Sequence, residues 1–469
     1  MPAFKYRGVM LDPARLLEKR GYYYGLLPWL KEWGYNTLHL HFTDDQGCAM
    51  VFPSHPELAT SGAFTPDEMR DFIKAAKKHG ISVIPELESL GHTRFITNCR
   101  GYRKLGGKQG SAIKFNSLDP NNREVRALLK DLLADIAAIF PAEVIHAGLD
   151  EVDMSALPGF RGVSRADQWK AFARHAAWVH EEIRKLGRRP AMWGDHILHS
   201  PKMAGRFKKD VLIFDWHYNA PLDNGSLLFF LDRGFEVWGC PASMQAGQRV
   251  LTAVGSQFRN LREFAANGLL LKKRGCTGMI NTIWCPWRYL SGVMDLPMAF
   301  AGHLFFEREE SPTFAREFCA GFYGLKKANA QTCASAIWQL HDAAPERQRY
   351  MRLIQAPANL TREDRRAFGE MQRVARTVAG RVKPLVGAAA RNGDRLNDYV
   401  LTARIMQVLG RFGESGAKRS AVGNIAPLLK ACDKSWWSTK DQPWDTPEYP
   451  YTETRLLLPT LKSLPMIGL

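Results

Sequence analysis

Short apolar stretches alternate with longer segments of helical periodicity through most of the chain. Eight of these stretches have the length and the β-branched or aromatic content of buried strands. They lie at residues 4–12, 37–42, 82–86, 144–148, 190–193, 211–216, 235–238 and 279–284. Repeated strand–helix alternation is typical of a parallel sheet, and eight such units close the sheet into a barrel. The sequence therefore predicts an α/β fold, specifically a (β/α)8 TIM barrel.

The segments between these strands carry helix start and stop signals. Thr65-Pro66-Asp67-Glu68 combines a capping threonine, a proline in the first turn and an acid three residues after the cap. Ser164 is a second candidate cap, and Gly34 and Gly80 end helical segments. Helices are therefore expected near residues 22–33, 66–80, 122–140 and 164–186.

The pattern changes after residue 307. Long helical stretches rich in Ala, Arg and Leu are expected near residues 312–322, 326–343, 361–391 and 394–412. A tail from Trp436 is rich in Pro, Trp and Tyr, and we expect an ordered wrap there rather than a helix. The sequence thus predicts two domains, a barrel at residues 1–307 and an α-helical C-terminal domain at 308–469. The second domain is also a candidate for a homodimer contact.

Polar and aromatic side chains are expected at the ends of successive strands. The carboxyl ends of barrel strands form the rim at which active sites are built. The candidates for this rim are Arg7, Asp44, His92, Asp150, Glu151, Trp193, Trp216 and Trp284. A scatter of purely structural residues would not favour one rim.

Two adjacent acids, Asp150 and Glu151, follow the strand at 144–148, and Gly148 allows the chain to turn there. Neighbouring side chains at a strand exit point in different directions, so the two acids can address different atoms of one ligand. Close like charges should raise one pKa toward the range of a general acid. The alternative is a helix N-terminus whose dipole stabilises both acids.

Charge and composition narrow the choice of partners. The net charge of +17 raises nucleic acid as a partner, but the basic residues are spread along predicted helices and no recognition motif accompanies them. We therefore expect a solvated basic surface and no nucleic acid. No apolar run approaches the roughly 20 residues of a membrane helix, so no membrane partner is expected.

The N-terminus and the cysteines indicate the cellular compartment in which the protein is expected. The chain enters a strand-like stretch at once, without a visible signal peptide. Its eight cysteines are scattered, without metal-ligand spacing. We expect reduced thiols, a cytoplasmic protein, and neither a metal nor a cofactor.

Three tryptophans beside a carboxylate pair suggest a sugar site. Aromatic faces pack against the apolar face of a pyranose, while charged groups bind its hydroxyls. Each of Trp193, Trp216 and Trp284 could alone be a core residue, but three on one rim are less easily structural.

Four motifs in order resemble glycoside hydrolase family 20, the β-N-acetylhexosaminidases, over residues 4 to about 300. They are Phe4-Lys5-Tyr6-Arg7-Gly8 with Leu11-Asp12, the run from His39 to Gly47, Pro85-Glu86 leading to Gly91-His92-Thr93, and His146-x-Gly148-x-Asp150-Glu151. The organisation looks closest to hexosaminidase D-like members. The family's catalytic domain is a (β/α)8 barrel.

The resemblance implies a role for each residue. Glu151 would be the general acid, and Asp150 would hold the substrate's 2-acetamido group, whose oxygen attacks the anomeric carbon to give an oxazolinium intermediate. Asp44 and His92 resemble the dyad that orients the acid, and Arg7 matches the arginine that binds ring hydroxyls. Trp193, Trp216 and Trp284 would wall the acetamido pocket. The implied function is a retaining exo-β-N-acetylhexosaminidase acting on glycans with terminal N-acetylhexosamine.

The sequence also departs from the family pattern. Leu149 stands where the family usually has a second glycine, and Pro286 stands where a Trp-x-Glu motif usually has its glutamate. The family's tyrosine that donates to the acetamido oxygen has no clear match in this sequence near Trp238, and we take Tyr218 in its place. Trp238 and Tyr218 are both substrate-binding candidates. The choice between gluco and galacto sugars stays open.

Two rival functions remain. A different glycosidase could use two enzyme carboxylates, for example Glu151 with Glu86 or Glu88, without need of a 2-acetamido group. A catalytically silent barrel would bind glycans without turnover.

Overall fold

The computed structural model describes residues 2–106, 117–244, 255–343 and 347–442. The chain divides into two compact units. The first comprises Met1–Pro241 and Glu263–Ile283, and the second Ala242–Arg262 and Trp284–Leu469.

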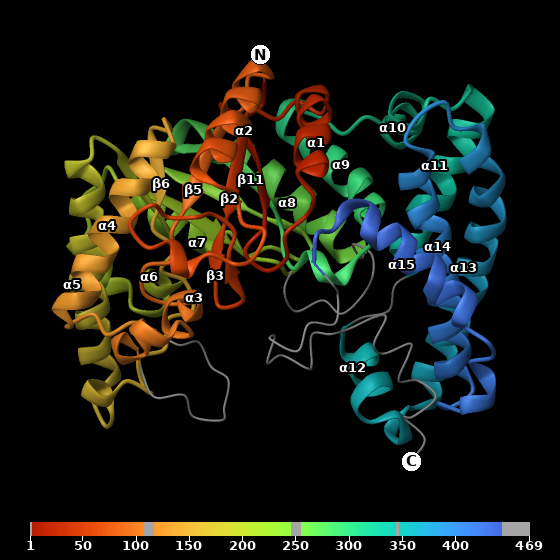
Figure 1. Cartoon of the computed structure of the whole chain (residues 1–469). Helices are drawn as coiled ribbons and strands as arrows, with labels where there is room; N and C mark the ends of the chain where they lie inside the picture. The colour runs from red at the N-terminus through yellow and green to blue at the C-terminus, as the bar shows by residue number, and fades with distance from the viewer. Residues whose placement is uncertain (1, 107–116, 245–254, 344–346, 443–469) are drawn as a thin grey trace. The chain divides into compact units, whose positions relative to one another are not determined.

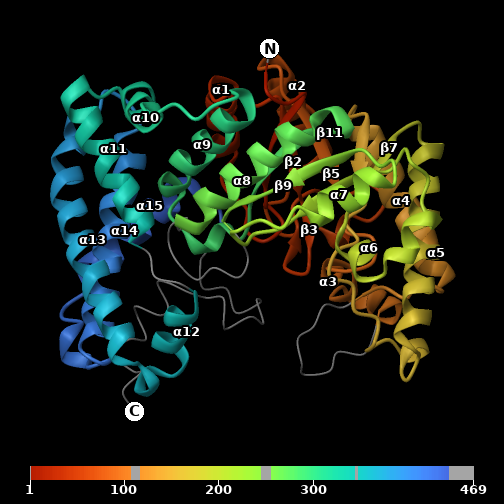
Figure 2. The ribbon, with the colours of Figure 1, turned by 180° about the vertical axis from the view of Figure 1, so that it is seen from behind.

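The first unit is built on a closed sheet of parallel strands, visible at the centre of its ribbon in Figures 1 and 2. Its strands are β1 (Tyr6–Leu11), β2 (Thr37–His41), β5 (Ser82–Glu86), β6 (Val144–His146), β7 (Arg189–Trp193), β8 (Leu212–Trp216), β9 (Val237–Cys240) and β11 (Cys276–Ile283). They are hydrogen-bonded in that order, and β1 also pairs in parallel with β11, which closes the ring. The predicted eight-stranded (β/α)8 barrel is confirmed.

The strands are short and almost wholly buried, as their apolar sequences predict. Residues Thr37–His41 of β2 are all buried, as are the last four of both β1 and β5. Because side chains alternate between the two faces, a strand that is buried on both faces packs the barrel interior on one side and the helices on the other.

Helices follow the strands and cover the outside of the barrel. They are α1 (Arg20–Glu32), α2 (Pro66–Lys78), α4 (Arg123–Ile139), α5 (Arg165–Lys185) and α7 (Gly225–Asp232), with the short α3 (Arg94–Thr97) before α4 and the short α6 (Asp195–His199) after β7. Helix α8 (Gly255–Leu271) begins in the second unit and enters the first unit at Glu263. The capping box of α2 forms as predicted, since Thr65 Oγ1 accepts from Glu68 N–H and the Glu68 carboxylate accepts from Thr65 N–H. Ser164 caps α5.

The second unit is mainly helical. It contains β10 (Ala242–Met244), α9 (Asp295–Phe306), α10 (Phe314–Tyr323), α11 (Lys327–Asp342), α12 (Arg347–Gln355), α13 (Arg362–Ala388), α14 (Gly393–Glu414) and α15 (Ala426–Thr439). The long helices α13 and α14 pack along each other, and Figure 1 shows them side by side in blue. None of the described helices of the chain is long and apolar enough to cross a membrane.

One expectation about the second unit is wrong. Trp436 was expected to open a non-helical tail, but it lies inside α15, buried, with its Nε1–H donating to the Gln442 carbonyl at 2.9 Å. The Pro residues that suggested an irregular chain come after the helix, and the rest of that tail, 443–469, lies outside the described residues.

Candidate active site

The acid pair lies on the loop that follows β6. Three residues of this loop have positive φ: Gly148 (64°), Leu149 (77°) and Glu151 (45°). A Cβ atom on Gly148 would lie 2.3 Å from Glu88 Oε2, so glycine is required there for space as well as for φ. Leu149 has a left-handed backbone conformation, which is energetically unfavourable for a residue with a side chain. This explains why a second glycine is common at this position in the family that the chain resembles.

Asp44 is fully buried at the end of the short strand β3 (Thr43–Asp44), just after β2. Its Oδ2 lies 2.7 Å from Arg15 Nη2 and 2.9 Å from His41 Nε2. Burial alone would raise the pKa of Asp44, but Arg15, His92 and His41 together hold it well below its usual range. Asp44 is therefore a fixed negative charge.

His92 connects Asp44 to the acid pair. Its Nδ1 lies 3.5 Å from Asp44 Oδ2 and 3.6 Å from Asp45 Oδ2. Its Nε2 lies 3.6 Å from Asp150 Oδ2 and 3.5 Å from Glu151 Oε2. Burial would lower the pKa of His92, but Asp150 and Asp44 raise it well above its ordinary value, so the ring is an imidazolium.

The two acids of the pair have opposite environments. Burial raises the pKa of Asp150 to about 7, against the attraction of His92 and with further repulsion from Asp195, Glu86 and Glu151. Glu151 has 45% of its side chain exposed. Burial raises its pKa too, but the His92 contact outweighs that and lowers it overall. The expected rise in one pKa of the pair thus falls on Asp150, not on the residue expected to be the acid.

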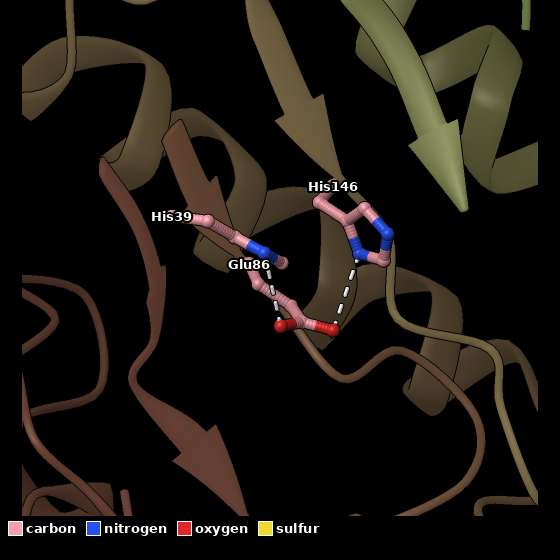
Figure 3. Close-up of side chains that lie close together, drawn as sticks. All are labelled: His39, Glu86 and His146. Carbon is pink, nitrogen blue, oxygen red and sulfur yellow. Dashed lines mark ion pairs between the residues drawn. The ribbon is translucent and has the colours of Figure 1, made fainter. Parts of the chain in front are cut away.

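A polar cluster in the barrel interior lies behind Asp44. His41 Nδ1 is 2.7 Å from Glu86 Oε2, so His41 bridges Glu86 and Asp44. Burial lowers the pKa of His41, but the two carboxylates raise it to about 10, which makes this ring a cation. Figure 3 shows the Glu86 carboxylate directed at His39 and His146, at 3.0 and 3.2 Å.

Among the described residues, four groups of His, Asp and Glu could hold a metal ion, with ligand atoms within 4.8 Å of one another. They are His39–Glu86–His146, His41–Glu86–Glu88, Asp44–Asp45–His92 and Asp195–His196–His199. In the first two groups Glu86 already accepts from Trp193 Nε1–H at 2.6 Å and pairs with His41. These contacts explain why the side chains of the first two groups lie together: they form a hydrogen-bonded core.

The predicted aromatic residues have three different locations. Trp193, at the end of β7, is fully buried and serves as a donor to Glu86, so it is not an exposed pocket wall. Trp216 ends β8, is half-buried, and stacks on Tyr218 with ring centroids 5.1 Å apart. Trp216 Nε1 has no hydrogen-bond partner in the described part of the chain, so this pair offers a donor and an aromatic face at the rim. Trp284 is a buried residue of the second unit, and its N–H donates to the Met244 carbonyl at 3.0 Å.

The placement of Trp238 as a substrate-binding residue is wrong. It is the second residue of β9 and stacks on Tyr6 at 4.5 Å, while its Nε1–H donates to Thr277 Oγ1 at 3.0 Å. Tyr6 is the first residue of β1 and Thr277 the second residue of β11, so Trp238 packs toward the amino ends of these strands, away from the acids.

Arg7 is also wrong as a sugar-binding residue. It is the second residue of β1, and its guanidinium donates to the carbonyls of Phe4 and Gly34, both at 2.7 Å. Gly34 precedes β2, so Arg7 lies at the amino end of the barrel. The arginine near the acids is Arg15, which follows the carboxyl end of β1 and also contacts Asp12 at 3.0 Å. The sequence signal that identifies Arg15 is its position after the strand, whereas Arg7 lies early within the strand.

Two further residues near the acids were not found from the sequence. Asp195 and His196 open α6, directly after Trp193 and Gly194 at the end of β7. Asp195 Oδ2 accepts from Glu151 N–H at 3.1 Å, and His196 Nε2 accepts from Val152 N–H at 2.6 Å. Their place after a barrel strand was a signal, but bonds from side chain to backbone leave no pattern in the sequence.

The barrel, its acid pair and the Asp44–His92 contact define a class of protein, a TIM-barrel domain with carboxylate chemistry at the carboxyl rim. The glycosyl hydrolase family 20 catalytic domain matches residues 4–242. The chain belongs to this family, and the resemblance seen in the motifs is confirmed.

Similar proteins agree with the family. A β-hexosaminidase of Vibrio furnissii is 28% identical over 273 residues, covering 50% of this chain and 43% of that protein. A β-N-acetylhexosaminidase of Cellulomonas fimi is 25% identical over 272 residues, covering 55% of this chain and 48% of that protein. The chain thus spans less than half the length of either relative.

Solved structures support the fold. A chitobiase of Flavobacterium johnsoniae has a TM-score of 0.57 at 17% identity, covering 99% of this chain and 78% of that one. A β-N-acetylhexosaminidase of Bacteroides fragilis has a TM-score of 0.56 at 20% identity, covering 68% of this chain and 70% of that one.

Proposed function

We propose that this protein is a retaining exo-β-N-acetylhexosaminidase that removes terminal β-linked GlcNAc or GalNAc by substrate-assisted catalysis. The observation that carries the proposal is the convergence of Asp44, Asp150 and Glu151 on the imidazole of His92, whose Nε2 lies 3.6 Å from Asp150 and 3.5 Å from Glu151. The substrate is a glycan or glycoconjugate with a terminal N-acetylhexosamine.

Glu151 is the proton donor in this scheme, because it is the acid of the pair with an exposed side chain. A bound sugar covers that side chain and removes water, which raises the pKa of Glu151 toward that of a general acid. The proton passes to the glycosidic oxygen as the acetamido oxygen attacks the anomeric carbon and the C1–O bond breaks. Glu151 then takes a proton from the water that opens the oxazolinium ring, which restores the β-configuration and the acid.

Asp150 holds the acetamido group. Its Oδ1 has no hydrogen-bond partner among the described residues and is buried, so it is available to accept the acetamido N–H. As that nitrogen becomes positive in the oxazolinium ion, an ionised Asp150 stabilises it in a site that is largely closed to water. The scheme needs no metal or cofactor.

Arg15 replaces Arg7 as the residue that binds ring hydroxyls. Its guanidinium is oriented by Asp12 and Asp44 on the side of the barrel where the acids lie. The stacked Trp216 and Tyr218 supply an apolar face and donors for the acetamido group.

The two-carboxylate rival is disfavoured by burial. Glu86 and Glu88 are both fully buried. Glu86 is also bound by His41 and Trp193, so it is not available as a nucleophile. A catalytically silent barrel is disfavoured because every charged group that the scheme requires is present and oriented. A cytoplasmic location and a homodimer contact stay predictions.

The test compares two nitrophenyl β-glycosides that differ only in a 2-acetamido or a 2-hydroxyl group. The proposal expects hydrolysis of the first alone and inhibition by a thiazoline mimic of the oxazoline. Equal turnover of both, or a covalent sugar–enzyme ester, would support the two-carboxylate rival. Binding of the sugar without any turnover would support the silent barrel.

A further inference from the structure

Two consecutive side chains of α6 accept hydrogen bonds from two consecutive backbone amides of the acid loop. Asp195 Oδ2 accepts from Glu151 N–H at 3.1 Å, and His196 Nε2 accepts from Val152 N–H at 2.6 Å. The donors belong to the catalytic acid itself and to the residue after it. The acceptors are the first two residues of α6, which follows the next barrel strand, β7.

The surroundings of His196 keep its ring in one position. His196 is 2% exposed, and its ring packs against Phe172 and Trp169 with centroids 4.7 and 5.1 Å away. Because the Val152 N–H donates to His196 Nε2, this ring nitrogen carries no proton of its own and acts as an acceptor. The packing leaves this ring little freedom to turn away from Val152.

The acid loop needs such support. Glu151 has φ 45° and Leu149 has φ 77°, a conformation that non-glycine residues adopt at a cost and keep only when their surroundings hold them. The Glu151 side chain is 45% exposed and is restrained at its tip by His92. Its backbone therefore has to be fixed separately if the carboxyl is to meet a glycosidic oxygen reliably.

We propose that Asp195 and His196 are positioning residues that clamp the backbone of Glu151 and Val152 and so aim the acid at the leaving group. This inference rests on the proposed function of Glu151. Neither residue touches the reacting atoms in this scheme. Without the clamp, the loop relaxes toward ordinary φ values and the carboxyl moves away from the glycosidic oxygen.

The variants are Asp195→Ala, Asp195→Asn and His196→Phe. Asp195→Asn keeps a side-chain oxygen that can accept from Glu151 N–H, whereas the alanine removes it. His196→Phe keeps an aromatic ring among Phe172 and Trp169 but removes the acceptor. Lys202→Gln is the control, because Lys202 lies exposed just after α6.

The kinetic test uses aryl 2-acetamido-β-glycosides from 2,4-dinitrophenyl, a good leaving group, to phenyl, a poor one. Asp195→Ala and His196→Phe should lower kcat for the phenyl substrate by about 10- to 100-fold, a loss typical of displaced catalytic groups. The dinitrophenyl substrate needs little protonation, so its kcat should fall no more than a few-fold. Asp195→Asn should recover most of the loss, and Lys202→Gln should match the wild type. Equal losses over the whole series would overturn the inference.

Amide hydrogen exchange supplies a readout that does not depend on turnover. Peptides that span residues 147–155 should exchange faster in Asp195→Ala and His196→Phe than in the wild type or in Lys202→Gln, while the remaining peptides are unchanged. If the wild type hydrolyses no 2-acetamido glycoside, the proposed function fails while this exchange still tests the clamp. Unchanged exchange in the loop would reject the clamp even in an active enzyme.

Discussion

At the scale of single residues, Glu151 differs from its neighbours in being accessible. His92 and Asp44 are buried, whereas 45% of the Glu151 side chain is exposed. We therefore expect Glu151→Gln to keep its fold and its sugar binding but to lose about 10²–10⁴-fold in rate on substrates with poor leaving groups. Steady-state kinetics with a phenyl glycoside checks this, with Glu143→Gln, an exposed glutamate before β6, as control. A variant within a few-fold of wild type would remove Glu151 from the role.

The charges of the acid pair also predict a pH profile. Burial raises the pKa of Asp150 to about 7, whereas the His92 contact lowers the pKa of Glu151 below its ordinary value of 4.5. Between these values the pair holds a single proton, which the reaction uses on Glu151 while Asp150 is ionised. kcat/KM should therefore fall above about pH 7, where the proton is lost, and again at low pH, where both acids are protonated. An activity that still rises above pH 8 would contradict this assignment.

The sequence predicted which polar residues lie together where these residues follow strands. It failed where the prediction required knowing at which end of a strand a residue lies. Asp44, His92, Asp150 and Glu151 follow strands, so the barrel places them together. Arg7 was misplaced because a strand of six residues has two ends, and an arginine near its start lies at the opposite end from the acids. Trp238 failed for the same reason, being second in its strand.

At the scale of elements, α14 is tied to its neighbours by one buried acid. Asp398 accepts from Gly292 N–H at 2.8 Å and from the Ser435 hydroxyl of α15. Burial raises the pKa of Asp398 to about 6 from 3.8, against these two bonds and Arg395. A carboxyl whose pKa is raised by folding stabilises the folded state below its unfolded pKa, and this contribution is lost as the pH rises from about 4 to 6.

Asp398→Asn should therefore flatten the pH dependence of stability. The pKa difference of about two units corresponds to roughly 3 kcal/mol in the free energy of unfolding between pH 4 and 6. Comparing the wild type with the variant by chemical denaturation at several pH values isolates this group, because other buried acids contribute equally to both proteins. Parallel pH curves would mean that Asp398 does not titrate with folding.

Elements were the best-predicted level. The bounds of strands with continuous apolar residues, and of helices with a cap or a terminal glycine, were predicted to within a few residues. The predicted strand at 82–86 has the same bounds as β5 in the structure. Trp436 shows the limit. A cluster of Trp and Pro in the sequence suggested irregular chain, but the local pattern does not reveal that buried packing keeps Trp436 in a helix.

At the scale of the whole molecule, the choice of sugar in the proposed function depends on which groups bind the outer hydroxyls. Family members often carry a glutamate in a Trp-x-Glu motif that binds the outer hydroxyls, and this chain has Pro286 at that position. A proline side chain neither donates nor accepts, so Pro286 cannot make the charge-assisted contact that such a glutamate makes. The orientation of Arg15 by Asp12 and Asp44 is unaffected by this loss, so part of the hydroxyl recognition should survive.

Gluco and galacto sugars differ only at the 4-hydroxyl, and a site that bonds a hydroxyl discriminates far more than one without that partner. We therefore expect cleavage of both β-N-acetylglucosaminides and β-N-acetylgalactosaminides, with kcat/KM values within about two decades, or roughly 3 kcal/mol. Matched nitrophenyl substrates measure the ratio, and Pro286→Glu should widen it if the missing carboxylate is the cause. A preference beyond about 10³ for one sugar in the wild type would show that another residue performs the glutamate's task.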